Sequence, residues 1–384
     1  MSDRRLLVVM FQLGDQANGG VNSLCEILYG LEDYAITVLT QLNTPLNERL
    51  RAAGMTVVVA PPDSTGSGLL VKLRFANWVR RQLRREDYSL VHVNDMQALL
   101  HTMAVWKWWG IPVVYNIRGV FARGRKYGVH WRIVNYCDKV IALSKDMREN
   151  LRRRLPLNVA ARSGNLLDFV YSIVDFERFH PVGDADEKLA LRSRLGLPAE
   201  GFLAIYVAKF GPKKLQLEYI DRVLRQRSGE LLAGGVVTAF VGDMDAEHNA
   251  YARRCATALE ALDSSLYHVA GYRANVEDYY RAADLVIVPS LREGMARCMI
   301  EGASCGIPVV SFEVTSAREI LEDHAAGWVV EQGGYDELAD KMIELAGDPV
   351  ACREAGANGF ALSRELFDRK EAVRAYEAIY SSLA

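Results

Sequence analysis

The chain has 384 residues, of which half are hydrophobic and 24% are charged, and its formal net charge is −2. This length suits two domains of roughly 150–200 residues, and the composition excludes a disordered, collagen-like or membrane-spanning chain. The charge is distributed unequally between the two halves of the chain. Residues 1–180 hold 24 Lys and Arg against 16 Asp and Glu, or +8, whereas residues 181–384 hold 22 against 32, or −10.

Apolar runs of strand type alternate with helical stretches along nearly the whole chain, an order that predicts parallel sheets with crossover helices. We therefore expect an α/β fold with two doubly wound, Rossmann-like domains. The expected strands are 6–11, 35–40, 56–60, 90–93, 112–116 and 139–143 in the first half, and 202–208, 236–241, 267–270, 285–289, 308–312 and 327–330 in the second. The aperiodic segment 175–186 lies between them, and we place the hinge there.

Two features of the sequence bear on its cellular compartment. The six cysteines lack the close spacings of a disulfide scaffold or a zinc site, which predicts reduced thiols and no metal site. The apolar run 6–11 is too short for a signal peptide or a spanning helix. Both features favour a cytoplasmic protein.

The loop after the first expected strand holds Gly19 and Gly20, just before a helical stretch. Two glycines let the backbone approach a ligand closely, and a helix N-terminus offers unpaired N–H groups to an anion. The spacing is not GxGxxG, so the dinucleotide-binding fingerprint is absent. A turn that needs small residues is the competing explanation.

Residues 69–86 show a helical pattern with two distinct faces. One face is apolar and the other basic, with Leu69, Leu73, Ala76, Val79 and Leu83 on the first and Arg74, Trp78, Arg81 and Arg85 on the second. A basic face with an exposed Trp fits an anionic membrane surface, and a solvated helix is the alternative. No RNP-like, helix-turn-helix or zinc pattern directs this charge to nucleic acid.

The first expected strand of the second half leads into a loop with three lysines, Lys209, Lys213 and Lys214. Ligands of open α/β sheets bind at the carboxyl ends of strands. Three ammonium groups at that place would clamp a diphosphate and offset charge on a leaving group. Solvated surface lysines are the alternative.

The segment 289–310 holds more candidate functional residues than any other stretch of the chain. A strand ends at Pro289, Glu293 and Gly294 open a loop, and a helix is expected to start near Met295. Glu301 would then lie about two turns into the helix, roughly 10 Å along its axis. This separation fits two hydroxyl-bearing parts of one extended ligand better than an acid–base pair on one bond. Otherwise, Glu293 caps the helix and Glu301 is a solvated helix residue.

The Glu-x7-Glu run, followed by Gly306-Ile307-Pro308-Val309-Val310, resembles the signature of the family 4 glycosyltransferases of GT-B fold. Other motifs match in the same order: Gly19-Gly20, 140–144, 175–179 with Pro181, Val241-Gly242-Asp243, and Gly271 with 279–284. The resemblance implies two Rossmann-like domains facing each other across a cleft. Residues 1–178 would bind the acceptor, residues 179–367 would bind the nucleotide-sugar donor, and a C-terminal helix, about 368–384, would pack back on the first domain.

The resemblance also implies an activity. The protein would be a retaining hexosyltransferase of polysaccharide biosynthesis that moves a sugar from a nucleotide-diphosphate donor, UDP- or GDP-linked, to a hydroxyl of a glycan, lipid-linked or small-molecule acceptor. It would need no metal or other cofactor, and would work in the cytoplasm or peripherally at the inner face of the membrane. The basic first half fits an anionic acceptor. Two alternatives stay open, a nucleotide-sugar epimerase of GT-B fold and a nucleotide-sugar-binding subunit that has lost transfer.

Carried over position by position, the resemblance assigns Glu301 to the ribose hydroxyls of the donor and Glu293 to the transferred sugar. Lys209 and Lys214 would contact the diphosphate through their ammonium groups, and Gly294, Met295 and Ala296 would contact the sugar or the diphosphate through backbone N–H groups. Gly20, also an expected donor-site residue, would face the diphosphate or the acceptor.

Three positions depart from the family pattern. Arg118 stands where the family often has His, and because Arg is not a general base near neutral pH, we expect it to steady negative charge. Ser172-Ile173 replaces Asn-Gly at the hinge. Ala208-Lys209 replaces Gly-Arg, which keeps the charge but loses the bidentate fork. We expect Glu293, Arg118, Lys209 and Lys214 to be the catalytic residues.

Overall fold

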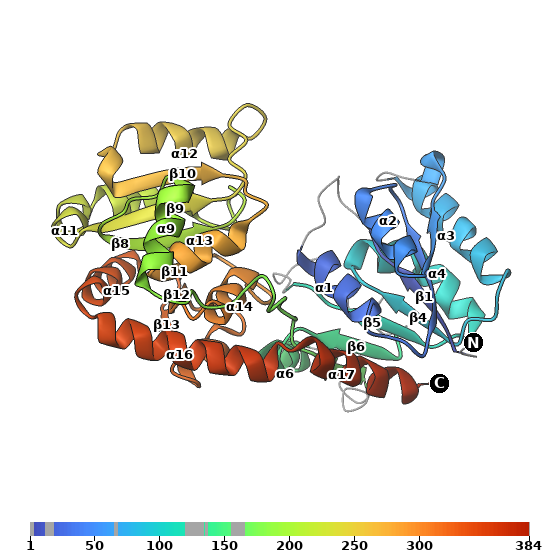
Figure 1. The fold of residues 1–384 in the computed structure, drawn as a ribbon. Helices are drawn as coiled ribbons and strands as arrows, with labels where there is room; N and C mark the ends of the chain where they lie inside the picture. Colours follow the sequence, from blue (N-terminus) through green and yellow to red (C-terminus); the bar gives the residue numbers. More distant parts are fainter. Residues whose placement is uncertain are drawn as a thin grey trace. The chain divides into compact units, whose positions relative to one another are not determined.

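The computed structural model describes residues 4–11, 19–64, 68–119, 134, 137–154 and 166–383, except for the side chains of 103, 104, 106–109 and 154. The chain divides into two compact units (Figure 1). Unit 1 is formed by Met1–Ile173 with Asp368–Ala384, and unit 2 by Val174–Phe367. The first boundary therefore falls five residues before the expected boundary at residue 178.

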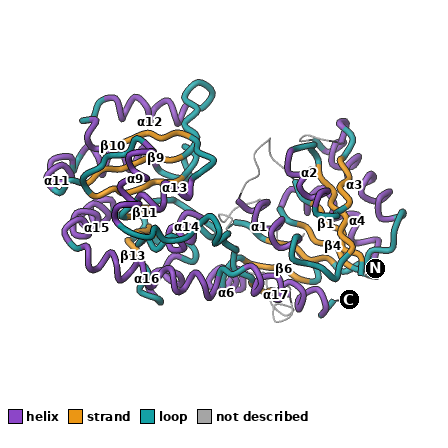
Figure 2. The backbone as a smooth tube through the Cα atoms, viewed as in Figure 1, coloured by secondary structure: helices purple, strands orange, loops and turns teal. Residues whose placement is uncertain are grey.

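Strands and helices alternate through both units (Figure 2). The strands are β1 (Arg5–Val9), β2 (Ala35–Thr40), β3 (Thr56–Val59), β4 (Leu90–Val93), β5 (Val113–Asn116), β6 (Lys139–Ala142), β7 (Leu167–Phe169), β8 (Phe202–Val207), β9 (Val236–Val241), β10 (Tyr267–Gly271), β11 (Leu285–Val288), β12 (Val309–Phe312) and β13 (Gly327–Val330). The helices are α1 (Gly19–Leu28), α2 (Pro45–Ala52), α3 (Leu69–Leu83), α4 (Met96–Trp109), α6 (Lys145–Arg154), α9 (Ala185–Leu195), α10 (Gln216–Tyr219), α11 (Ser228–Ala233), α12 (Ala250–Glu260), α13 (Val276–Ala282), α14 (Arg297–Ser304), α15 (Tyr335–Gly347), α16 (Pro349–Leu366) and α17 (Arg369–Ser381). Short helical turns are η1 (Pro62–Ser64), η2 (Ile220–Arg225), η3 (Ser264–Leu266) and η4 (Arg318–Glu322).

Unit 1 is built on a parallel sheet of strand order β3-β2-β1-β4-β5-β6-β7. The order reverses between β1 and β4, which is the switch point where ligands of open α/β sheets bind. The strands are short runs of Val, Ile and Leu because helices cover both faces of a parallel sheet. Every strand expected in this half is present, and β7 is an additional strand that the sequence did not indicate.

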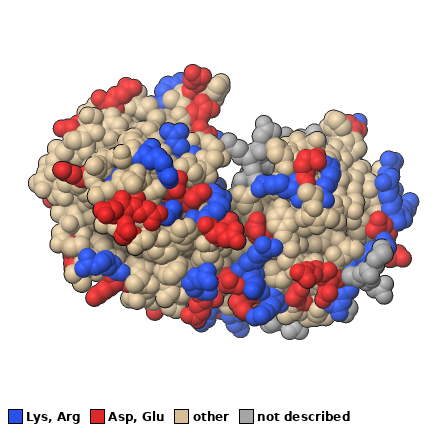
Figure 3. Space-filling view, in the orientation of Figure 1, with Lys and Arg blue, Asp and Glu red and all other residues tan. Residues whose placement is uncertain are grey.

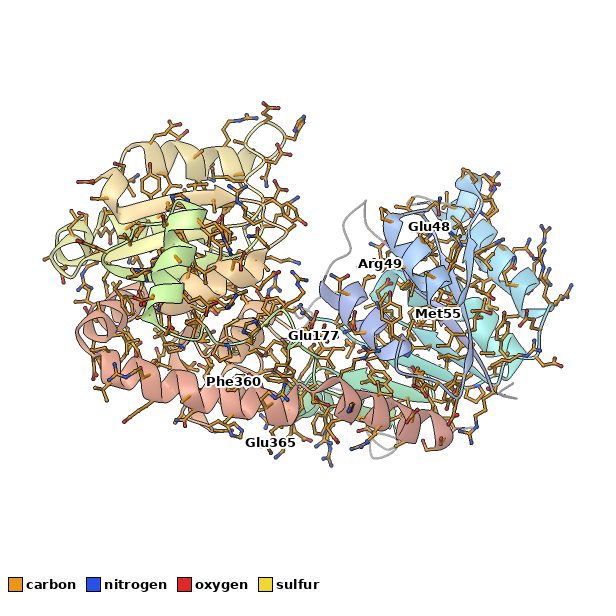
Figure 4. The ribbon with its side chains drawn as sticks, viewed as in Figure 1. Glu48, Arg49, Met55, Glu177, Phe360 and Glu365 are labelled. Carbon is orange, nitrogen blue, oxygen red and sulfur yellow. The ribbon has the colours of Figure 1, made fainter. Side chains whose placement is uncertain are left out.

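The C-terminal helix α17 belongs to the core of unit 1. Asp368 caps the helix by accepting hydrogen bonds from the backbone N–H groups of Lys370 and Glu371. Its buried residues share one apolar cluster with α1, β1 and β2. The cluster continues to Met55, which follows α2 (Figure 4). Burial of this apolar face, rather than helix propensity, holds the last helix on unit 1.

Unit 2 is built on a parallel sheet of strand order β10-β9-β8-β11-β12-β13. Every strand expected in the second half is present, and the order reverses between β8 and β11. A group of aromatic side chains fills the core beside β8 and β9, with Tyr206 packed against Tyr219 and Phe240 at ring separations of 5.5 and 5.7 Å. Both sheets thus have the doubly wound order that the sequence predicts.

Helix α3 confirms part of the expected assignment of its faces and corrects the rest. The side that packs inward carries Phe75, Val79 and Leu83, as well as Gln82. Leu69 and Leu73, expected in the core, are 74% and 56% exposed, and the neighbouring Leu70 is 71% exposed. Val79 and Leu83 are buried as expected, but Phe75 takes the inward position expected of Leu69 and Leu73, and the half-buried Trp78 packs beside Phe75 at a ring separation of 5.4 Å. Three leucines and the arginines that follow therefore share the outward face.

The outward face of α3 is basic along its later turns. Arg80, Arg81 and Arg84 are exposed there, and Figure 3 shows Lys and Arg side chains gathered at this edge of unit 1. Within the described residues, no helix is long and apolar enough to cross a membrane.

Candidate active site

The candidate site of unit 2 lies at the switch point of its sheet. Two loops leave the carboxyl ends of the neighbouring strands β8 and β11, and they carry most of the residues expected to bind the donor. A backbone hydrogen bond from Leu291 N–H to the Lys213 carbonyl, 2.9 Å long, joins the two loops. The hydroxyl of Tyr206 contacts the Lys214 carbonyl from the core. The loops are thus held by the sheet beneath them.

Lys214 and Glu293 form an ion pair across the switch point, with Nζ 2.5 Å from Oε1. Glu293 is the more buried partner, with 15% of its side chain exposed against 30% for Lys214. Burial lowers the pKa of Lys214, but the charge of Glu293 and its hydrogen bond with the ammonium, together with the nearby Cys298, outweigh this effect and leave the pKa above its usual value. Lys214 is therefore a full positive charge held against a carboxylate at this end of the sheet.

Lys209 does not join this pair. Its side chain is 70% exposed, and its Nζ lies 2.8 Å from Oδ2 of Asp243, which follows β9. The hydrogen bond with Asp243 raises the pKa of Lys209. Lys213, the remaining lysine of this loop, is exposed. The structure thus gives Lys209 and Lys214 separate acidic partners, rather than gathering the lysines into one cluster.

The loop before α14 is buried and lacks a side-chain cap. Gly294, Met295 and Ala296 are all buried, and Ala296 is the N-cap residue of the helix. The helix therefore starts two residues later than the expected Met295. The hydroxyl of Ser316 donates to the Gly294 carbonyl at 3.3 Å and supports the loop from the other side.

Glu301 lies in the second turn of α14 and already has two protein partners. Its Oε2 accepts a hydrogen bond from the hydroxyl of Tyr280, on α13, at 3.0 Å. Its Oε1 accepts from Nε of Arg297 at 2.9 Å, and Nη2 of Arg297 lies at the same distance. Only 11% of the Glu301 side chain is exposed. The residue is therefore a buried, hydrogen-bonded carboxylate and not the solvated helix residue of the alternative interpretation.

The two expected site residues of unit 1 follow strands next to its switch point. Gly20 lies in the first turn of α1, after β1, and Arg118 follows β5. The guanidinium of Arg118 donates to Oδ1 of Asn94 from Nη2 at 2.7 Å and from Nε at 3.2 Å. Asn94 follows β4, so two neighbouring strand ends fix this arginine.

Beneath Arg118, α17 contributes two tyrosines to a buried polar group. The Tyr376 hydroxyl is hydrogen-bonded to the Asn116 side chain, and the Tyr380 hydroxyl lies 2.6 Å from Nδ1 of His92. Burial, with a smaller effect from the charge of Arg118, lowers the pKa of His92 to about 3. His92 is therefore neutral in the folded chain at ordinary pH.

This buried histidine predicts an acid-sensitive stability. Between about pH 6.5 and 3 the unfolded chain binds a proton at His92 that the folded chain does not. The free energy of unfolding should therefore fall as the pH is lowered through this window, by up to about 1.4 kcal/mol per pH unit from this group. Urea unfolding at pH 7, 6 and 5 measures the slope.

The matched variants are His92→Phe with Tyr380→Phe, and Tyr380→Phe alone. The double variant removes both polar partners and should flatten the dependence on pH, whereas the single variant keeps the histidine and should retain it. An equal slope in the wild type and the double variant would contradict the assignment to His92.

Several contacts of the site were not predicted from the sequence. Asp243 and Tyr280 lie within motifs that the sequence indicated, but no local pattern pairs them with Lys209 and Glu301. Asn94, which holds Arg118, lies in no such motif. Arg297 is different, because it stands four residues before Glu301 on a helix, and this spacing places two side chains on one face. Among the described residues, no three His, Cys, Asp or Glu side chains are grouped as a metal site requires.

Two doubly wound units, with a switch point in each sheet, have the architecture of the GT-B fold. Solved structures of this kind match the chain along nearly its whole length. The glycosyltransferase of Rickettsia africae matches with a TM-score of 0.81 at 16% identity, covering 99% of this chain and 98% of that one. Anabaena HepE, solved with UDP and glucose, matches with a TM-score of 0.79 at 21% identity, covering 98% and 99%.

The sequence comparisons define the family. The model for Glycosyltransferase Family 4 matches residues 17–161, and that for Glycosyl transferases group 1 matches residues 202–348. The D-inositol 3-phosphate glycosyltransferase of Xylanimonas cellulosilytica is 30% identical over 338 residues, which are 80% of this chain and 75% of that protein. The chain belongs to glycosyltransferase family 4.

Two further relatives extend the comparison. The D-inositol 3-phosphate glycosyltransferase of Streptomyces bingchenggensis is 26% identical over 65% of this chain, and the match spans only about half, 54%, of that relative. The UDP-Gal:alpha-D-GlcNAc-diphosphoundecaprenol alpha-1,3-galactosyltransferase of Escherichia coli is 20% identical over 87% of each chain.

Proposed function

We propose that the protein is a retaining, metal-independent hexosyltransferase that takes its sugar from a nucleotide-diphosphate donor. The observation that carries the proposal is the Lys214–Glu293 pair at the switch point of a family 4 domain, with Glu301 in the helix that follows. A cation with two carboxylates suits a ligand in which a diphosphate joins two hydroxyl-bearing groups. Glu301 would bind the ribose, Glu293 the sugar, and the lysines the diphosphate.

In the proposed reaction, the bond between the anomeric carbon and the diphosphate oxygen breaks. The acceptor hydroxyl oxygen bonds to that carbon on the same face, and its proton passes to the departing diphosphate oxygen. Lys214 and the backbone N–H groups of 294–296 offset the charge on the leaving group. Arg118 cannot accept the proton, and its role in the proposal is to steady negative charge.

We further propose a phosphate-bearing acceptor. Residues 1–180 have a net charge of +8, and positive charge raises the local concentration of an anionic substrate. Two of the relatives carry inositol 3-phosphate or a diphosphoundecaprenol-linked sugar in their names. UDP-sugars are the first donors to test, because the Escherichia coli relative is named for UDP-Gal and HepE was solved with UDP, and GDP-sugars are the second.

Thermal unfolding with UDP, GDP, ADP and their sugars identifies the donor, since a ligand at one hundred times its Kd stabilises by about 2.7 kcal/mol. Labelled donor is then incubated with and without phosphorylated acceptors. Transfer that keeps the anomeric configuration of the donor supports the proposal, and inversion contradicts it. Rearrangement of the sugar without an acceptor would favour the epimerase. Binding with neither transfer nor slow hydrolysis would favour a binding subunit.

Metal independence gives a separate prediction. Because Lys214 and backbone N–H groups carry the charge of the leaving group in this proposal, transfer in excess EDTA should proceed within about twofold of the untreated rate. A loss of tenfold or more that Mg²⁺ or Mn²⁺ restores would show that a metal ion supplies this charge instead.

We also propose that the outward face of α3 binds an anionic membrane surface, which would place the enzyme peripherally at the cytoplasmic face. Leu69, Leu70 and Leu73 form an exposed apolar patch at the start of the helix, and arginines follow on the same face. Inserting leucines gains about 1.5–3 kcal/mol for each fully buried side chain, and each arginine near an anionic surface adds about 1 kcal/mol.

Sedimentation with vesicles tests this surface. The wild type should bind vesicles with 30% phosphatidylglycerol at least tenfold more tightly than pure phosphatidylcholine. Changing the three leucines to serine should remove the binding without lowering transfer to a soluble acceptor. Leu189→Ser is the matched control, because Leu189 is 49% exposed on α9 in unit 2. Equal binding of the triple variant and the wild type would refute the proposal.

A further inference from the structure

The carboxylate expected to bind the ribose is already occupied by protein donors. A carboxylate offers about four acceptor positions on its two oxygens. Arg297 donates from Nε to Oε1 of Glu301 and places Nη2 at 2.9 Å from the same oxygen, while Tyr280 donates to Oε2. A ribose diol that hydrogen-bonds both oxygens would therefore have to compete with Arg297 at Oε1.

Arg297 is placed to leave Glu301 when a ligand arrives. It is the first residue of α14, directly after the buried loop 294–296, and 28% of its side chain is exposed. Tyr280, in contrast, is fully buried and is expected to stay on Oε2. Of the two donors on Glu301, the arginine is the one that solvent or a ligand can reach.

Besides its contact with Glu301, Arg297 stands next in the chain to a residue that lies near the charged groups of the candidate donor site. Cys298, the next residue in the chain, is within the electrostatic reach of Lys214, Glu293 and Glu301 together. Burial raises the pKa of its thiol to about 12, so Cys298 adds no charge of its own. Lys209, at the position where the family pattern has an arginine, is exposed and paired with Asp243. In this part of the site, Arg297 offers the planar fork that matches phosphate oxygens.

We propose that Arg297 exchanges partners when the donor binds. In the empty site its guanidinium holds the Glu301 carboxylate, and in the complex it moves to the diphosphate and leaves Glu301 for the ribose hydroxyls. This inference rests on the proposed function, because it requires a nucleoside diphosphate at this site. It makes Arg297 a specificity-determining residue that links recognition of the diphosphate to recognition of the ribose.

The exchange has a thermodynamic signature. A nucleoside without phosphates must displace Arg297 from Glu301 and gives the guanidinium no new partner. A nucleoside diphosphate supplies that partner. Its binding therefore replaces the Arg297–Glu301 ion pair with one between Arg297 and the diphosphate, whereas binding of the nucleoside does not. Removing Arg297 should therefore weaken the diphosphate while leaving the affinity for the nucleoside unchanged or raising it.

Calorimetric titration of the full chain with UDP and uridine, and with GDP and guanosine, tests this expectation. In Arg297→Leu, the Kd of the diphosphate that binds the wild type should rise at least tenfold, and that of its nucleoside should not rise. Arg297→Gln, which keeps an amide donor for Glu301 without the charge, should show the same pattern. Arg292→Leu is the control, because Arg292 is an exposed arginine of the loop that precedes α14. Circular dichroism confirms that each variant is folded.

Each result decides between roles for Arg297. Equal weakening of the nucleoside and the diphosphate would mean that Arg297 only orients Glu301, and unchanged Kd values would mean that it contributes nothing. Either result overturns the exchange while leaving the proposed function intact. A wild type that binds no nucleoside diphosphate would overturn both.

Discussion

Replacing either Lys214 or Glu293 with alanine is expected to lower kcat/KM for sugar transfer by about 100- to 1,000-fold, the usual effect of losing one preorganised electrostatic group. Lys214→Ala removes the ammonium that would offset charge on the departing diphosphate. Glu293→Ala removes the carboxylate that would hold the sugar, and it also frees Lys214 from its 2.5 Å ion pair. Steady-state kinetics with the identified donor measures both effects.

The two substitutions should not be additive. Each single variant already breaks the pair and leaves one charged partner in a partly buried site, so the double variant should lose less than the product of the single losses. A coupling near zero would show that the two residues act independently.

A second ion pair of similar length supplies the control. Lys341 and Glu344 lie 2.6 Å apart on α15, and Lys341→Ala and Glu344→Ala should retain normal kcat/KM. Melting temperatures separate loss of function from loss of fold. Near-normal transfer by both Lys214→Ala and Glu293→Ala would refute the assignment of the donor site.

The fold was predictable where a single local pattern determines each element. Buried parallel strands are short, mostly apolar runs rich in Val, Ile and Leu, as in Val236–Val241 and Leu285–Val288, and loops with Gly or Pro bound them. Strand β7 lacks this pattern, because Leu167-Asp168-Phe169 is only three residues long and half-buried. On α3, the burial of Val79 and Leu83 was predicted correctly and that of Leu69 and Leu73 was wrong. Phe75 and Leu73 are both apolar, and only the rest of the domain decides which of the two is buried.

The site was predictable in its residues and not in its pairings. Family motifs indicated Lys209, Lys214, Glu293 and Glu301 as separate positions. The pairing of Lys214 with Glu293 joins residues 79 positions apart, and it depends on the adjacency of β8 and β11, which no local pattern encodes. Whether Lys209 faces Glu293 or Asp243 likewise depends on where β9 ends. The contact of Arg297 with Glu301 was accessible from helical spacing alone.

The second large effect is expected from Gly242→Ala, at the end of β9. A Cβ at this position would overlap the carbonyl oxygen of Ala208 and would lie 3.1 Å from the backbone nitrogen of Lys209. Both neighbours are backbone atoms, so the clash cannot be relieved by turning a side chain. The ends of β8 and β9 would have to separate, although Ala208 N–H donates to the Val241 carbonyl at 3.0 Å and Phe210 N–H to the Asp243 carbonyl at 3.0 Å.

Forced overpacking of this kind typically costs 1–3 kcal/mol. Because it strains backbone on two strands, we expect a loss of about 3 kcal/mol, at the upper end of that range, and a Tm lower by about 6–12 °C for a unit of this size. Scanning calorimetry of the full chain measures the change. Gly229→Ala on α11 is the matched control, since nothing lies within 4 Å of its added Cβ, and it should keep or slightly raise the Tm.

In Gly242→Ala, the separation of the two strand ends should also move Lys209 and Asp243 and raise the Kd of the nucleoside diphosphate. A Gly242→Ala variant with the Tm of the wild type would show that the two strand ends are not packed as closely as described.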